Sequence, residues 1–160
     1  MNIGVISDTH SRAVPEQVLK ELKKMDFVIH AGDIGSKSFF DEFKKINDVK
    51  AVYGNMDDGT LRSVLPRSQI ILCASFAIGL FHGEGHPGHL VECVQKEFKD
   101  KKVDVIVFGH SHHPMNEIKD GILFFNPGSA TDTVFAPFRS YGVLEISDVI
   151  KGRIIKIDEK

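Results

Sequence analysis

The sequence predicts an α/β fold in which two packed, mixed sheets carry helices on their outer faces. In the first third of the chain, apolar strands alternate with amphipathic helices, which is typical of parallel strands joined by right-handed crossovers. Towards the C-terminus the pattern changes to hairpins, which add antiparallel strands. The length of 160 residues is that of one domain, so we expect a single domain over residues 1–160.

Three strands and two helices are predicted in the first third. Strands are expected at 2–7, 27–30 and 50–53, and helices at 15–24 and 37–46. The first helix follows from the helical spacing of Val18, Leu19 and Leu22. Residues 56–67 are rich in Asp, Gly and Pro, so we expect a loop there.

Hairpins and one helix are predicted in the rest of the chain. Strands at 69–73 and 76–81 form a hairpin, and the turn pair Asp120-Gly121 joins strands at 115–119 and 122–126. Between the hairpins, apolar spacing predicts an amphipathic helix at 88–100 and a buried strand at 104–108. Strands at 141–146 and 153–157 complete the two sheets.

The composition excludes several classes of protein. Hydrophobic residues make up 42% and charged residues 26%, and the net charge of -2 gives no strong signal for nucleic acid or for an anionic membrane. No apolar run approaches the roughly 20 residues of a membrane helix. A strand that begins at Asn2 leaves no room for a secretory leader, and Cys73 and Cys93 are interpreted as buried thiols. We therefore expect a cytoplasmic protein.

Five predicted strands end on side chains that can bind metal ions. A glycine directly precedes three of these side chains, Asp33, Asn55 and His110. Because the carboxyl ends of parallel strands lie at one edge of a sheet, we expect the side chains to converge there. The candidate ligands are Asp8, His10, Asp33, Asn55, His82, His110 and His112.

The number and spacing of these residues favour a centre with two metal ions. In an extended segment residues i and i+2 point to the same side, so we expect Asp8 to converge with His10, and His110 with His112. An Asp at a strand end often caps the next helix, and a lone His is more often a satisfied polar group, but capping does not explain these pairs. Seven such ligands exceed what one cation accepts, whereas two cations about 3.5 to 4 Å apart can use them.

The five strand ends resemble, in order, the motifs of the calcineurin-like metallophosphoesterase family. The short chain and the run Asn126-Pro127-Gly128-Ser129 make it most similar to the family's small prokaryotic phosphodiesterases. The resemblance implies a four-layer α/β/β/α sandwich with a dinuclear centre. It implies that Asp33 bridges the metals and is catalytic together with Asn55 and His110. The remaining assignments that it implies are Asp8, His10 and His112 on one metal, and Asn55, His82 and His110 on the other.

The function implied by this resemblance is hydrolysis of a small phosphodiester by a hydroxide that bridges two divalent transition metals. The centre would carry about one net positive charge, which complements a phosphodiester monoanion. Ligands that are all nitrogen and oxygen suit manganese, which we expect first, and also nickel, iron, zinc and cobalt.

One position departs from the family's pattern. The family often continues Gly-Asn with His, and its small branch with Cys, where this chain has Met56. Methionine does not donate a proton, so the acid that would protonate the leaving group is absent at this position. Two histidines, His86 and His113, or a metal-bound water are the candidates to replace it.

Other functions stay open at the level of sequence. The fold also resembles a retromer subunit that serves as a scaffold, so a non-catalytic, metal-stabilised interaction module is the first alternative. A phosphomonoesterase or a nuclease is the second, although neither is favoured by a net charge of -2. The apolar run from Val134 to Phe138 packs into the core, forms a wall for substrate, or forms a contact in a homodimer.

Overall fold

A computed structural model describes residues 1–157. The elements occur in the order β1 (Asn2–Ile6), α1 (Glu16–Leu22), β2 (Phe27–His30), α2 (Lys37–Phe43), β3 (Val49–Ala51), α3 (Gly59–Val64), β4 (Ser68–Cys73), β5 (Phe76–Phe81), the 3-10 helix η1 (Pro87–His89), α4 (Leu90–Glu97), β6 (Val105–Val107), β7 (Met115–Lys119), β8 (Ile122–Asn126), β9 (Ser140–Ile146) and β10 (Ile150–Lys156).

The strands form two sheets of five, with the orders β10-β9-β1-β2-β3 and β4-β5-β6-β8-β7. Within the first sheet β1, β2 and β3 are parallel, and within the second β5, β6 and β8 are parallel. The hairpin strands pair antiparallel at the sheet edges, so both sheets are mixed, as the sequence predicts.

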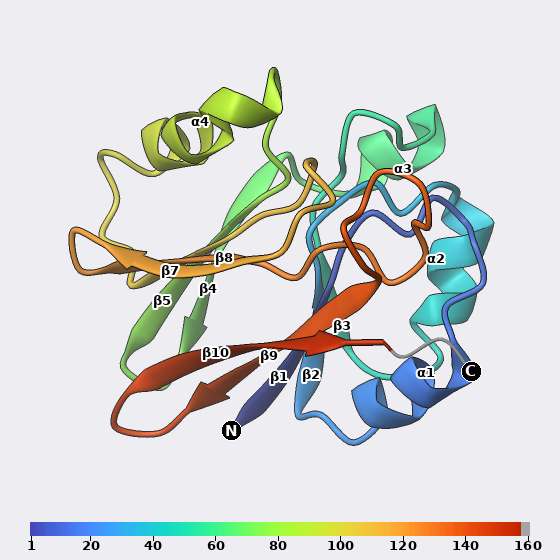
Figure 1. Cartoon of the computed structure of the whole chain (residues 1–160), viewed down its shortest axis with the longest axis horizontal. Coiled ribbons are helices and arrows are strands. Elements are labelled where there is room, and N and C mark those ends of the chain that lie inside the picture. The colour runs from blue at the N-terminus through green and yellow to red at the C-terminus, as the bar shows by residue number, and fades with distance from the viewer. Residues whose placement is uncertain (158–160) are drawn as a thin grey trace.

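Three apolar layers hold the fold together. The cluster between the sheets joins residues such as Val5 and Ile29 of one sheet to Leu80 and Val107 of the other. A second cluster lies under α1 and α2, and a third lies under α4. Figure 1 shows α4 on one side of the sheets and α1 and α2 on the other. The predicted α/β/β/α sandwich is therefore confirmed.

Four local predictions need correction. The segment 56–67 contains a helix, α3, because the Asp58 side chain accepts a hydrogen bond from the Leu61 N–H and Leu61 packs into an apolar cluster. The helix expected from residue 88 begins as an α-helix only at Leu90, after a 3-10 turn that contains Pro87. The last strand starts at Ile150, not at Arg153, since its pairing with β9 continues to that residue. Cys73 is buried as expected, but Cys93 is half-buried.

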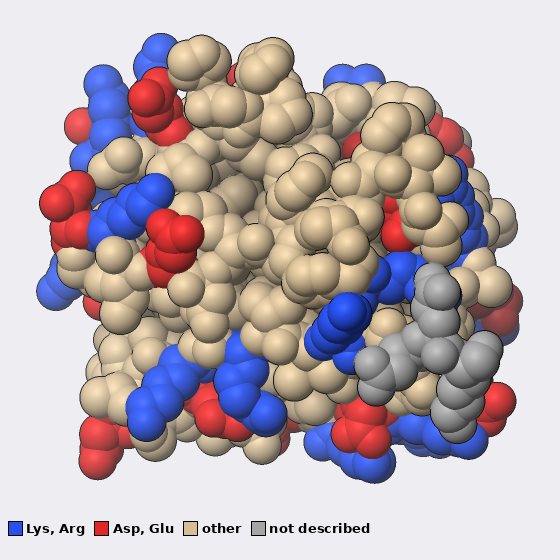
Figure 2. All heavy atoms as spheres, viewed as in Figure 1, with Lys and Arg blue, Asp and Glu red and all other residues tan. Residues whose placement is uncertain are grey.

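The surface carries no large field of one charge on the face that Figure 2 displays, where Lys and Arg are interspersed with Asp and Glu around the edge. Within residues 1–157, no helix combines the length and the apolar character that a membrane crossing requires.

Candidate metal centre

The seven predicted ligands follow the carboxyl ends of β1, β2, β3, β5 and β6, and the structure brings them to one region. Ligand atoms of Asp8, His10 and His112 lie within 4.8 Å of one another, and those of Asp8, Asp33 and His82 do the same. Asn55 and His110 lie beside these two groups: the His110 ring is 5.3 Å from the His82 ring, and its Nδ1 is 3.1 Å from Asn55 Oδ1.

The backbone at the site is left-handed, not extended as the spacing argument assumed. Five of the seven residues have positive φ angles: Asp8 (56°), His10 (51°), Asp33 (51°), His110 (68°) and His112 (58°). The strands end before these residues, and the chain turns sharply at each of them. Non-glycine residues adopt this conformation at an energetic cost, and such strain is concentrated at functional sites.

Two glycines permit the close approach of these turns. A Cβ atom on Gly54 would overlap the Asp33 side chain and backbone, and a Cβ atom on Gly109 would overlap Ser7 and the Asp8 carboxylate. The glycine before each predicted ligand therefore has the steric reason that the sequence suggested.

His82 is oriented with one nitrogen towards the carboxylates. Its Nδ1 lies 2.7 Å from the Ala31 carbonyl oxygen, which has no proton, so Nδ1 carries the hydrogen and donates it. In the neutral ring Nε2 then has a lone pair, and this atom lies 3.3 Å from Asp33 Oδ2 and 3.9 Å from Asp8 Oδ1. A lone pair that faces two carboxylates requires a proton or a metal cation.

His112 and His110 repeat the arrangement. The Asp132 carboxylate bonds His112 Nδ1 at 2.5 Å, which leaves Nε2 facing Asp8 Oδ1 at 3.3 Å. His110 Nε2 donates to the Gly85 carbonyl at 2.8 Å, which leaves Nδ1 facing the Asn55 oxygen. In each of the three rings the outer nitrogen is bonded to an acceptor, so the inner nitrogen is free to act as a ligand.

In the carboxylates of Asp8 and Asp33, one oxygen accepts a backbone hydrogen bond and the other faces the histidines. Asp8 Oδ2 accepts the His110 N–H at 3.2 Å, and Asp33 Oδ1 accepts the Met56 N–H at 2.7 Å. The inner Asp8 Oδ1 is buried without a hydrogen-bond partner, and so is His82 Nε2. Unpartnered buried polar atoms are costly, so these two atoms fit a divalent cation. The two groups of clustered ligand atoms consist of histidine nitrogens and carboxylate oxygens.

The charges at the site shift the pKa values of the histidines. Burial alone lowers the pKa of His82, but the neighbouring carboxylates of Asp33 and Asp8 outweigh it and raise the pKa to about 9. Interaction with Asp8 raises the pKa of His112 to about 9, with support from Asp132. Without metal, a proton on each ring therefore balances the carboxylates.

Three residues that the sequence analysis did not select position the predicted ligands. Asp132 is 1% exposed and holds His112. Asp57 accepts hydrogen bonds from Gly35 and Gly54, which joins the loops that carry Asp33 and Asn55. His30 is fully buried, with its pKa lowered by burial to about 3, and it accepts the Gly32 N–H. Asp57 follows the Gly54-Asn55 pair by two residues, whereas no local pattern marks the other two.

The run Asn126-Pro127-Gly128-Ser129 supports the same region from behind. The Ser129 hydroxyl donates to the Asp8 carbonyl at 2.9 Å, and the Asn126 amide donates to the Gly109 carbonyl at 2.8 Å. This turn therefore fixes the backbone at two of the strand ends that carry predicted ligands.

A cavity of about 440 Å³ opens over this region, which is a size typical of small-molecule sites. Its lining consists of His10, Arg12, Asp33, Asn55, Met56, His110, His112, Asp132 and Phe135. Neither candidate acid lines it: exposed His86 accepts the Gly88 N–H, and exposed His113 bonds the Ser111 carbonyl.

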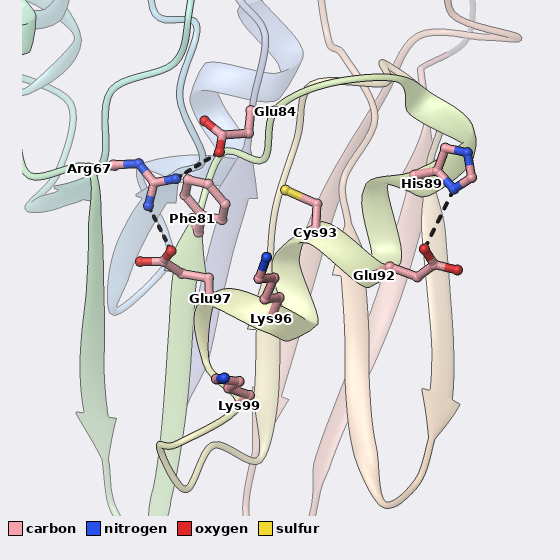
Figure 3. A pocket seen from close by; sticks show the side chains of 9 residues that line it. All are labelled: Arg67, Phe81, Glu84, His89, Glu92, Cys93, Lys96, Glu97 and Lys99. Atoms are coloured by element: carbon pink, nitrogen blue, oxygen red, sulfur yellow. Dashed lines mark hydrogen bonds and ion pairs between the residues drawn. The ribbon is translucent and has the colours of Figure 1, made fainter.

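A larger hollow of about 540 Å³ lies beside α4 (Figure 3). Arg67 there is paired with Glu84 and Glu97, and His89 is paired with Glu92. Figure 3 shows these pairs along its wall, with the Cys93 thiol near Phe81. Lys96 and Lys99 of its lining are exposed to solvent, and none of the buried polar atoms without a hydrogen-bond partner among the described residues belongs to it. This hollow therefore lacks the buried unpartnered groups that distinguish the region at the strand ends.

The fold and the clustered ligand atoms define the class of metal-dependent phosphoesterases with two packed sheets. Residues 1–149 match the model of the calcineurin-like phosphoesterase superfamily domain, and the chain belongs to that family. The resemblance seen in the sequence is thereby confirmed, and the family uses divalent metals.

Known relatives cover nearly the whole chain. A probable metallophosphoesterase of Methanocaldococcus jannaschii is 37% identical, over 99% of this chain and 83% of that protein. A second protein of the same organism, named a phosphodiesterase, is 29% identical over 80% of this chain and 83% of that protein. Among solved structures, Vps29 of Entamoeba histolytica complexed with Zn²⁺ superimposes with a TM-score of 0.74 at 26% identity, over 98% of this chain and 99% of that one.

Proposed function

We propose that this protein is a phosphodiesterase that hydrolyses small phosphodiesters with two divalent transition-metal ions. The observation that carries the proposal is the buried pair of unpartnered ligand atoms, Asp8 Oδ1 and His82 Nε2, at the centre of a cluster of histidines with oriented inner nitrogens. Membership of the metallophosphoesterase family supports the same chemistry. Manganese is the first metal we expect, and nickel, iron, zinc and cobalt suit the same donors.

We assign Asp8, His10 and His112 to one metal, and Asn55, His82 and His110 to the other, with Asp33 between them. The position of Asp33 supports its assignment, since its Oδ2 lies 3.3 Å from His82 Nε2 and 3.9 Å from His10 Nε2. Asp8 Oδ1 also lies near a histidine of each set, so both carboxylates neutralise the region between the metals.

The protein's own groups then orient the substrate. When bound, the two cations supply a water of lowered pKa as nucleophile and neutralise charge on the phosphate oxygens. Asn55 is exposed at the cavity, where its amide N–H donates to a phosphate oxygen. Among residues 1–157, Arg12 is the only Lys or Arg in the lining, which suits a diester monoanion better than a monoester dianion or a nucleic-acid strand.

The test is turnover by the full chain reconstituted with Mn²⁺. We expect hydrolysis of bis(4-nitrophenyl) phosphate to exceed hydrolysis of 4-nitrophenyl phosphate, and the activity to be lost in Asp33→Asn. Asp120→Asn, an exposed change in the β7–β8 turn, is the matched control and should be unaffected. A metal-loaded protein that hydrolyses no diester, or that works equally without metal, would exclude the proposal.

The second candidate is a non-catalytic scaffold of the same fold, favoured by the likeness to Vps29. A scaffold would bind metal at the same residues and hydrolyse none of the diesters. The two candidates are therefore separated by comparing metal content with turnover in the same preparation.

A further inference from the structure

The mouth of the candidate site has an apolar side that metal binding and hydrolysis do not require. Phe135 and Met56 both line the cavity, and they are 74% and 64% exposed. Single exposed apolar side chains are common on protein surfaces, but two that line the same cavity beside a candidate site indicate a contact surface for a ligand or a partner. Of the alternatives for the run from Val134 to Phe138, packing of Phe135 into the core is thereby excluded.

The loop that carries Phe135 is fixed to the candidate metal centre. The Asp132 carboxylate accepts the N–H groups of Val134 at 2.8 Å, Phe135 at 3.2 Å and Ala136 at 3.2 Å. The same carboxylate bonds His112 Nδ1. One buried side chain therefore fixes the backbone of the loop that carries Phe135 relative to a predicted metal ligand.

The backbone of the second apolar residue, Met56, is also hydrogen-bonded to the candidate metal centre. The Met56 N–H donates to Asp33 Oδ1, so the backbone of Met56 is held beside the carboxylate that we place between the metals. A thioether and a phenyl ring are flexible or flat apolar groups that contact aromatic rings favourably. Arg12 lies in the same lining and carries a permanent positive charge.

We infer that Phe135 and Met56 form the binding wall for an aromatic ester group of the substrate. The inference rests on the proposed function for the phosphate end of the ligand, and it adds that the preferred diesters carry a flat ring on one ester oxygen. The ring lies on the Phe135 side chain, and the phosphate lies over the cluster of Asp8, Asp33 and the histidines. A cavity of about 440 Å³ with one cation accommodates a single small ligand of this kind.

The test compares two ligands with one headgroup. Phenylphosphonate and methylphosphonate have a P–C bond that is not hydrolysed, so their affinities report binding without turnover. Calorimetry on the Mn²⁺-loaded full chain at about pH 8 gives the ratio of the two dissociation constants. We expect the phenyl compound to bind about tenfold more tightly, the size of one aromatic stacking contact.

Substitutions at Phe135 separate stacking from apolar burial. We expect Phe135→Ala to bring the ratio close to one while leaving the affinity for methylphosphonate within about twofold. Phe135→Leu keeps an apolar side chain and should give an intermediate ratio. Leu72→Ala is the matched control, because Leu72 is 79% exposed on β4 and does not line the cavity.

An unchanged ratio in Phe135→Ala would overturn the inference. If sedimentation then showed a homodimer that the same substitution dissociates, the loop would be a subunit contact. This result is distinct from failure of the proposed function, in which the native protein hydrolyses no diester although the phosphonates can still be compared. Selective binding of phenylphosphonate that depends on Phe135 supports the inference in either case.

Discussion

The candidate metal centre consists of a buried half and an open half. Asp8, Asp33 and His82 are 0%, 3% and 1% exposed, and each has one polar atom held by backbone while the other faces inward. Asn55 is exposed and His110 is only half-buried; the two side chains contact each other, and His110 also donates to the Gly85 carbonyl.

The difference in burial shows that the ligand atoms of the two halves are positioned in different ways. The buried half is positioned by sheet ends and backbone hydrogen bonds that form with folding itself, so its ligand atoms are preorganised. The open half depends on the loops after β3 and β6, which carry Asn55 and His110 and contact solvent. We therefore expect the two cations to bind with unequal affinity, the weaker one beside Asn55 and the cavity.

The largest effect should come from Asp33, the buried carboxylate that we assign between the two metals. Asp33→Asn removes a negative charge and the group assigned between the metals, so we expect activity to fall about 10³-fold or more. The loss should exceed that of any single His substitution.

Metal content sharpens this comparison. The native protein should hold about two metal ions per chain, and Asn55→Ala should reduce this to about one because it alters only the open half. Elemental analysis of the native protein and of Asn55→Ala measures the difference in metal content. Equal metal content in Asn55→Ala and the native protein would show that the two halves are not separate sites.

The next effect concerns the open half, where Met56 stands in place of a proton donor. Met56→His places an acid beside Asn55, and a positioned acid accelerates such reactions by about 10² to 10⁴-fold. The gain should appear on alkyl esters, whose leaving groups need a proton, and scarcely on aryl esters. A rate series across diesters of graded leaving-group pKa measures it. A shallow dependence in the native protein would mean that another residue already acts as the acid.

A smaller effect on metal affinity is expected from Asp132, which supports His112. Asp132→Asn keeps the shape of the side chain but removes the charge that supports His112, so we expect metal affinity to fall about 10 to 100-fold. Competition with a chelator measures this affinity. Asp120→Asn serves as control, and equal affinities in both variants would remove Asp132 from the positioning of the ligand.

The smallest expected effect is a dependence of the stability of the metal-free protein on pH. In the metal-free protein the pKa values of His82 and His112 are raised to about 9, above the ordinary value near 6.5. Their contribution to stability is therefore full below about pH 6.5 and is lost as pH rises through about 9. Urea unfolding of the metal-free protein across this range measures it, and stability that rises with pH would contradict it.

Metal should displace the same protons. Since both rings are largely protonated near pH 7.5 in the metal-free protein, Mn²⁺ binding should release up to about two protons per chain. Activity should rise from acid to mildly alkaline pH for the same reason. Calorimetry in buffers of different ionisation enthalpy counts the protons, and a count near zero would contradict the pKa shifts.

The sequence by itself determined the class of fold and the set of candidate ligands. Alternation of apolar and polar residues is a local property, so β1, β2, β5 and β8 were predicted within a residue or two. The segment 56–67 was predicted as a loop because Asp58 and Gly59 are typical turn residues, and the packing of Leu61 is a long-range contact. Local patterns do not contain such contacts.

Only the tertiary structure decided how the ligands are held. The spacing of Asp8 and His10 suggested an extended backbone, but the turns that bring the five strand ends together place both residues at positive φ. The support of His112 by Asp132 joins residues that lie 20 positions apart, and that of His82 by the Ala31 carbonyl spans 51. These contacts depend on which strands become neighbours, and pairing between distant segments is not encoded in any local run of residues.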